Sequence, residues 1–166
     1  MDHEISKKRI TALVILRLLI GWHFLYEGVV KLYNPAWTAK AYLLGASGPF
    51  TDFFRWLSSD SVILAVDFTN VFGLLAIGIA LILGFQERVA AVAGMVLLLF
   101  YYLSQPPLPG SGQIGVEGNY FIVSKNLIET AALFVLYLFP TGQHFGMGVF
   151  GNKNTSHKSH HLNEPL

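Results

Sequence analysis

The chain contains no cysteine among its 166 residues. This absence excludes disulfide bonds, thiolate redox chemistry, covalently attached c-type haem and cysteine-ligated iron–sulfur clusters. Any electrons that the protein handles must therefore travel through a bound molecule or a partner.

Charge is also scarce. Asp, Glu, Lys and Arg make up 13% of the residues, whereas 53% are hydrophobic, and the mean hydropathy is +0.51. Such a chain is too apolar for an ordinary soluble domain of this length, and we interpret it as an integral membrane protein whose main partner is the lipid bilayer. The formal net charge is only +1, and the few basic residues do not form a patch, so we expect no nucleic-acid partner.

Four apolar stretches have lengths near the roughly 20 residues that a helix needs to cross a bilayer. Proline or glycine follows the third and the fourth stretch and ends them. We therefore predict an all-α fold, a four-helix transmembrane bundle with spans at about residues 10–32, 61–83, 88–103 and 120–139.

The loop after the first span is expected to hold two short interfacial helices. Asn34 followed by Pro35 is typical of a helix N-cap and first helical position, and Asp52 suits the first turn of a second short helix. The many aromatic residues of this loop favour a place at the membrane interface or over the mouth of the bundle.

Lys and Arg residues near the span ends predict the orientation. Those on one side of the four-span topology are Lys7, Lys8, Arg9, Arg88, Lys153 and Lys158. Under the positive-inside rule both termini are then cytoplasmic, although Lys40 and Arg55 in the outer loop oppose this. We expect a cytoplasmic N-terminus (1–9), a four-span domain (10–146) and a polar, disordered tail (147–166).

Ionisable residues inside the predicted spans are the main functional signal. At 100° per residue, Arg17, His23, Glu27 and Lys31 share one stripe of the first span. Charges at membrane depth are costly unless they face protein or a wet cavity. Polar residues of the second and fourth spans lie at a similar depth. We predict that seven residues meet near the outer mouth: Glu27, Lys31, Asp67, Asn70, Lys125, Asn126 and Glu129.

Two interpretations of this cluster stay open, a structural network that fixes helix register and a functional site. His23 is a candidate proton relay or haem ligand, but no second histidine lies at matching depth. The tail residues His157, His160 and His161 are candidate metal ligands, yet a polar tail of this kind is more often disordered. We expect no haem and no metal.

The stretches RLLIGWHFLYEGVVKLYNPAW, LLAIGIALILGFQERVAAVAG and EGNYFIVSKNLIETAALFVLYLFPTG resemble the DoxX/DoxD family of small four-span membrane proteins, over about residues 17–146. The best-known members are the membrane subunit of thiosulfate:quinone oxidoreductase. The resemblance implies a bacterial or archaeal cytoplasmic membrane protein. It also implies oxidation of two thiosulfate ions to tetrathionate outside that membrane, with quinone as the electron acceptor.

The resemblance, joined to the polar cluster, implies a role for each residue. Proton transfer would fall to Glu27, Asp67 and Glu129, because quinone reduction consumes protons. A small anionic substrate would bind the cationic and amide side chains of Lys31, Asn70, Lys125 and Asn126. Quinone would bind among four aromatic side chains, those of Trp22, Tyr26, Tyr101 and Tyr102.

The chain departs from the family at the end of the fourth span, where Phe145-Gly146-Met147-Gly148 replaces an acid-containing segment. The family enzyme has a second subunit, so we expect such a partner or a homo-oligomer. Two further hypotheses are a non-enzymatic membrane accessory protein, held together by its charge network, and a small proton or anion carrier. The unbroken predicted helices argue against the carrier.

Overall fold

A computed structural model describes residues 2–108 and 118–147. In chain order its elements are α1 (Asp2–Tyr33), α2 (Lys40–Leu44), α3 (Thr51–Leu57), α4 (Ile63–Leu83), α5 (Glu87–Ser104), β1 (Asn119–Tyr120), β2 (Val123–Ser124) and α6 (Lys125–Leu138). The all-α class is confirmed. Apart from Met147, the predicted disordered tail with its three histidines lies outside the described residues.

Three helices of the described chain are long and apolar enough to cross a membrane: the Lys7–Tyr33 part of α1, α4 and α5. Helix α6 differs, because its 14 residues extend only about 21 Å at 1.5 Å per residue, less than the roughly 30 Å of bilayer hydrocarbon. The protein is therefore a multi-pass membrane protein with three helices of spanning length and a shorter fourth helix beside them.

The predicted fourth span begins too early. A β-hairpin pairs Asn119 with Ser124 and Tyr120 with Val123, and α6 starts only after it. Ser124 ends the hairpin and caps the helix, since its hydroxyl accepts a hydrogen bond from the amide of Leu127 at 3.4 Å. Residues 120–124, which hydropathy alone assigns to the fourth span, thus belong to the hairpin.

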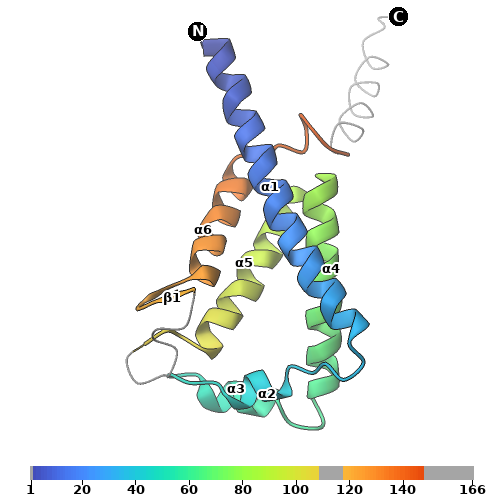
Figure 1. The fold of residues 1–166 in the computed structure, drawn as a ribbon, viewed down its shortest axis with the longest axis vertical. Helices are drawn as coiled ribbons and strands as arrows, with labels where there is room; N and C mark the ends of the chain where they lie inside the picture. The colour runs from blue at the N-terminus through green and yellow to red at the C-terminus, as the bar shows by residue number, and fades with distance from the viewer. Residues whose placement is uncertain (1, 109–117, 148–166) are drawn as a thin grey trace, which may run out of the picture.

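The four long helices form two pairs. Helix α1 packs along α4, and α5 packs along α6, while α4 and α5 join the pairs. Figure 1 shows that α1 begins and α6 ends at one end of the bundle, hereafter the terminal end, whereas α2 and α3 lie across the opposite end, hereafter the loop end. The pairs diverge toward the loop end (Figure 1).

Close backbone contact fixes the α1–α4 pair. A Cβ atom on Gly78 of α4 would lie 2.5 Å from the backbone nitrogen of Leu25 and 2.8 Å from the carbonyl oxygen of Gly21, both on α1. Only glycine permits this approach. The core between the pairs consists of buried apolar side chains, among them Ile20, Phe24, Leu74, Ile77, Leu81, Leu98, Leu133 and Leu136.

The outer loop contains the two predicted short helices, and Asp52 lies in the first turn of α3 as predicted, but α2 begins later than expected. Asn34 does not start a helix: its side-chain oxygen accepts a hydrogen bond from the amide of Ala36 at 3.1 Å, which forms a turn, and α2 begins only at Lys40. Helices α2 and α3 pack on each other through a small apolar cluster that includes Leu43 and Phe54. This cluster holds the loop as a cover on the bundle.

Candidate functional site

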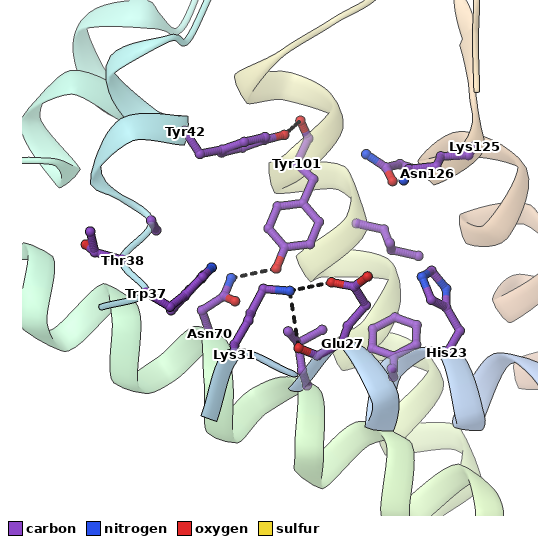
Figure 2. A pocket seen from close by; sticks show the side chains of 14 residues that line it. His23, Glu27, Lys31, Trp37, Thr38, Tyr42, Asn70, Tyr101, Lys125 and Asn126 are labelled. Carbon is purple, nitrogen blue, oxygen red and sulfur yellow. Dashed lines mark hydrogen bonds and ion pairs between the residues drawn. The ribbon is translucent and has the colours of Figure 1, made fainter. Parts of the chain in front are cut away.

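A cavity of about 260 Å³, hereafter the polar cavity, lies between the two helix pairs at the loop end. Side chains converge on it from α1, α2, α4, α5 and α6 (Figure 2). Its polar and aromatic lining comprises His23, Glu27, Lys31, Trp37, Thr38, Tyr42, Asn70, Tyr101, Lys125 and Asn126. A largely preformed, concave site with several converging polar groups is the usual form of a small-molecule site.

Glu27 and Lys31 form an ion pair within α1, one helical turn apart. The Lys31 ammonium lies 2.5 Å from a carboxylate oxygen of Glu27 and 5.6 Å from the centre of the Trp37 ring. The Lys31 charge is thus balanced by the carboxylate and also contacts an aromatic face of the outer loop. This pair occupies the middle of the cavity wall (Figure 2).

His23 and Glu129 form the second charged contact. The Nδ1 atom of His23 and a carboxylate oxygen of Glu129 are 2.8 Å apart and join α1 to α6. His23 lines the cavity, whereas Glu129 does not, so the carboxylate supports the ring from behind. A histidine held in this way by a carboxylate is suited to accept and release a proton.

Lys125 and Asn126 enter the cavity from the first turn of α6. The late start of α6 places them at its N-terminus and not two turns inside a span. Among the described residues, Lys125 has neither a carboxylate partner nor a side-chain hydrogen bond. The positive end of the helix dipole adds to its charge, so this corner of the cavity favours an anion.

Asn70 and Tyr101 form the opposite wall. The Asn70 amide nitrogen donates a hydrogen bond of 2.6 Å to the Tyr101 hydroxyl, and Tyr42 packs edge-on against the Tyr101 ring at 6.0 Å between centroids. The Tyr42 hydroxyl donates to the Tyr101 carbonyl oxygen at 3.1 Å. Burial, with a smaller contribution from Tyr101, raises the pKa of Tyr42 to about 12.

The outer loop covers this cavity, and Asp67 holds the loop in place. A carboxylate oxygen of Asp67 on α4 accepts a hydrogen bond from the backbone amide of Ala39 at 2.8 Å. On the other side, the Gln105 amide nitrogen donates to the Tyr42 carbonyl oxygen at 3.0 Å. The loop segment that contributes Trp37, Thr38 and Tyr42 is therefore fastened to both α4 and α5.

The structure brings together five of the seven residues predicted to meet: Glu27, Lys31, Asn70, Lys125 and Asn126 all line the polar cavity. The three acids turn toward different neighbours, namely Lys31, the Ala39 amide and His23. Asp67 and Glu129 support the cavity from outside its lining.

The predicted quinone-binding aromatics do not form one slot. Tyr101 lines the polar cavity, but Trp22 and Tyr26 are 61% and 57% exposed on α1, where a bilayer would contact them. The Tyr102 hydroxyl donates to the carbonyl oxygen of Ile122 at 2.9 Å and ties α5 to the hairpin. Trp22 and Tyr26 thus suit lipid contact, and Tyr102 has a structural contact.

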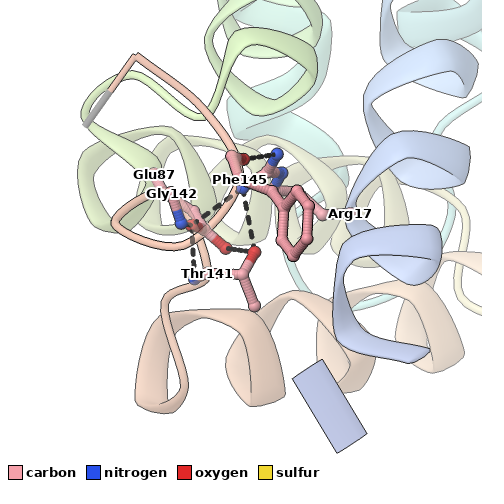
Figure 3. A network of polar contacts seen from close by, with 5 residues as sticks. All are labelled: Arg17, Glu87, Thr141, Gly142 and Phe145. Atoms are coloured by element: carbon pink, nitrogen blue, oxygen red, sulfur yellow. Dashed lines mark hydrogen bonds and ion pairs between the residues drawn. The ribbon is translucent and has the colours of Figure 1, made fainter. Parts of the chain in front are cut away.

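Arg17 lies apart from the rest of its predicted stripe and enters a second network at the terminal end (Figure 3). Its guanidinium lies 3.5 Å from the Glu87 carboxylate, with both side chains almost fully buried, and donates to the Thr141 hydroxyl at 2.9 Å and the Phe145 carbonyl oxygen at 2.6 Å. Glu87 also accepts hydrogen bonds from the Thr141 and Gly142 amides, both at 2.7 Å. This network fastens the segment after α6 to the α4–α5 turn.

The sequence reading missed the contributions of Trp37, Thr38, Tyr42, Glu87 and Thr141. The aromatic residues of the outer loop were a usable signal, because they indicated a cover over the bundle mouth. Glu87 gave no such signal, since an acid in a short polar turn is usually solvated; its burial follows from the segment after α6 folding over it.

The sequence profile of the DoxX family matches residues 12–104. This stretch runs from α1 through α5 and ends before α6, so it is shorter than the range over which the resemblance was expected. No curated protein and no solved structure matches the chain. Since the profile covers more than half of the 166 residues, the chain belongs to the DoxX family of membrane proteins.

Proposed function

We propose that this DoxX-family protein is a membrane oxidoreductase subunit that oxidises thiosulfate, or a similar small sulfur oxyanion, with quinone as the electron acceptor. The observation that carries the proposal is the polar cavity with its unbalanced positive charge at Lys125. We further propose that the protein lies in the cytoplasmic membrane of a bacterium or archaeon, with both termini in the cytoplasm and the polar cavity near the outer surface.

Charge balance favours an anion in this cavity. When His23 is protonated, the Glu27–Lys31 and His23–Glu129 contacts are each neutral, and the Lys125 ammonium is the remaining positive charge of the cavity lining. Asn126 beside it adds an amide that donates hydrogen bonds, and the first turn of α6 adds its dipole. A small oxyanion gains all three interactions, whereas a cation would meet only acids that already have partners.

The redox balance requires two thiosulfate ions, one quinone and two protons. Two sulfur atoms join in a new S–S bond, which gives tetrathionate, and the two electrons released reduce the quinone. The chain has no cysteine to relay them, so the two substrates must react close to each other or through a partner subunit. His23, held by Glu129 at 2.8 Å, is the group placed to relay these protons one after the other, whereas Glu27 is ionised in its pair with Lys31.

Thiosulfate-dependent quinone reduction tests this proposal, in membranes from cells that express the chain and its partner subunit and from cells that lack them. Lys125→Met should raise the KM for thiosulfate about tenfold, since one charged contact to an oxyanion contributes roughly 1.4 kcal/mol. The matched control is Lys40→Met, which removes a lysine at the same end of the bundle that pairs with Asp60 on the surface. Equal KM values for the two variants would refute the anion site.

The accessory-protein hypothesis makes the opposite prediction. If the charged contacts only hold the helices together, the double variant Glu129→Gln with Lys125→Met should change thermal stability and leave the cellular function intact. An active site requires the reverse, a loss of quinone reduction that exceeds any loss of folded protein.

A further inference from the structure

The β-hairpin before α6 carries an exposed apolar tip. Each of its strands is two residues long, and Phe121 and Ile122 form the turn between them. Residues 118–124 include no charged side chain. Exposed fractions between 42% and 64% are found at four consecutive residues, namely Tyr120, Phe121, Ile122 and Val123. A run of exposed apolar side chains at a turn is unusual in water and indicates an interaction surface.

The backbone of the turn is unfavourable for the residue that occupies it. Phe121 has a φ angle of +59°, in the left-handed region that bulky side chains rarely adopt. Hairpin turns of two residues normally place glycine, asparagine or aspartate at such a position. Because this conformation costs free energy, an aromatic side chain here needs a compensating gain. Removal of its ring from water by a partner would supply that gain.

The hairpin lies level with the end of a membrane-crossing helix. The Tyr102 hydroxyl, in the last turn of α5, donates to the Ile122 carbonyl oxygen at 2.9 Å. At the base of the hairpin, the Lys125 amide donates to the Gly118 carbonyl oxygen at 2.8 Å. Figure 1 shows that the hairpin projects sideways from the bundle beside the start of α6. Its tip therefore extends into the region that lipid occupies around the bundle.

We propose that this hairpin is a membrane anchor, with Phe121 and Ile122 inserted at the boundary between lipid headgroups and acyl chains on the loop-end side of the bilayer. Tyr120 beside them has the apolar ring and polar hydroxyl that suit this boundary. The hydrogen bond from Tyr102 satisfies a carbonyl oxygen of the turn within the protein. An apolar environment demands such internal pairing, whereas water would satisfy the carbonyl oxygen itself.

The size of the tip favours lipid over a protein partner. A stable protein interface buries roughly 800 Å² and about 20–30 residues on each side, whereas the tip offers four apolar side chains. A strand of two residues is also too short to pair with an added strand of another chain. A lipid surface needs no complementary shape and accepts a small apolar tip.

An anchor at this place sets the depth of the polar cavity. Lys125 and Asn126 line that cavity and follow the hairpin directly in the chain. With the tip at the headgroup boundary, these two residues lie close to the water on the loop-end side, where a dissolved anion reaches them. This depth holds whichever anion binds there.

Site-directed spin labelling tests the proposal. The chain has no cysteine, so a single introduced cysteine takes one nitroxide label. Ile122→Cys places the label at the tip, and Ile128→Cys places it on α6 as the lipid-facing control, at a residue that is 56% exposed. Asp60→Cys is the aqueous control, because that charged side chain is 90% exposed in the outer loop.

The purified variants are measured by electron paramagnetic resonance in lipid nanodiscs. Collision rates are compared for oxygen, which concentrates in lipid, and for a water-soluble nickel chelate. The label at Ile122 should collide several times more often with oxygen than with nickel, as at Ile128, and the label at Asp60 should show the reverse. If Ile122→Cys does not fold, Tyr120→Cys places the label on the other side of the turn.

A second substitution tests whether the aromatic ring holds the tip in the membrane. Asparagine tolerates a positive φ angle, so Phe121→Asn keeps the turn and removes the apolar side chain. It should raise the nickel collision rate at the Ile122 label severalfold, with an unchanged thermal midpoint.

Three outcomes would overturn the proposal. Equal nickel collision rates at Ile122 and Asp60 would place the tip in water. A label shielded from both reagents would show that a second copy or another protein covers the tip. An unchanged nickel collision rate in Phe121→Asn would show that the ring does not hold the tip in lipid.

Discussion

The buried network at the terminal end allows the sharpest stability prediction. In Glu87→Ala the Arg17 guanidinium, only 2% exposed, loses the carboxylate 3.5 Å away. The amides of Thr141 and Gly142 lose their acceptor in the same substitution. An uncompensated buried charge is among the costliest defects in a folded chain.

Removing one partner of a buried ion pair costs about 3–5 kcal/mol. For a protein of this size, 1 kcal/mol corresponds to roughly 2–4 °C, so the thermal midpoint should fall by about 10 °C. Circular dichroism of the protein in one detergent at one scan rate measures this midpoint, since unfolding of membrane proteins is commonly irreversible. Replacing both Arg17 and Glu87 by leucine should cost less than Glu87→Ala, because no charge is then left alone.

The exposed pair Lys40–Asp60 supplies the control, because Lys40→Ala breaks a surface ion pair and should leave the midpoint almost unchanged. If Glu87→Ala and Lys40→Ala have the same thermal midpoint, the network does not hold the segment after α6, and our account of that end of the bundle is wrong.

Three further predictions concern single positions. Asp67→Asn keeps an oxygen acceptor for the outer loop and should keep activity, whereas Asp67→Ala should raise the substrate KM more than it lowers kcat; equal losses in steady-state kinetics would instead assign Asp67 to proton transfer. Gly78→Ala should destabilise the protein by about 1–3 kcal/mol, because its Cβ would meet the Leu25 backbone at 2.5 Å, while Gly73→Ala, with no atom within 4 Å of its Cβ, should melt at or above the wild-type temperature. Folding raises the pKa of Tyr42 from 10.0 to about 12, so the buried neutral hydroxyl contributes fully to the stability of the fold below pH 10. This contribution is lost as the pH rises through about 12. An ultraviolet titration in which Tyr42→Phe removes no high-pH step would contradict this.

Local sequence patterns were sufficient to predict several helices of this protein and one of its ion pairs. Hydrophobic stretches near 20 residues long were sufficient to locate α1, α4 and α5, because a bilayer sets the length of a helix that crosses it. Helical periodicity placed Glu27 and Lys31 on one face, where they form their ion pair. The outer-loop aromatics indicated a cover over the bundle mouth, which α2 now provides.

Only the tertiary structure decided how these parts meet. Hydropathy does not distinguish an apolar hairpin from the start of a span, so the Ser124 cap and the first-turn position of Lys125 became visible only in the fold. The position of a residue along its helix does not show which neighbour its side chain faces. Asp67 is therefore predicted to meet Glu27, although its carboxylate accepts a hydrogen bond from the outer-loop backbone. The pairing of Arg17 with Glu87 joins residues 70 positions apart through a turn that folds over them, and contacts of that kind depend on packing that no local sequence pattern encodes.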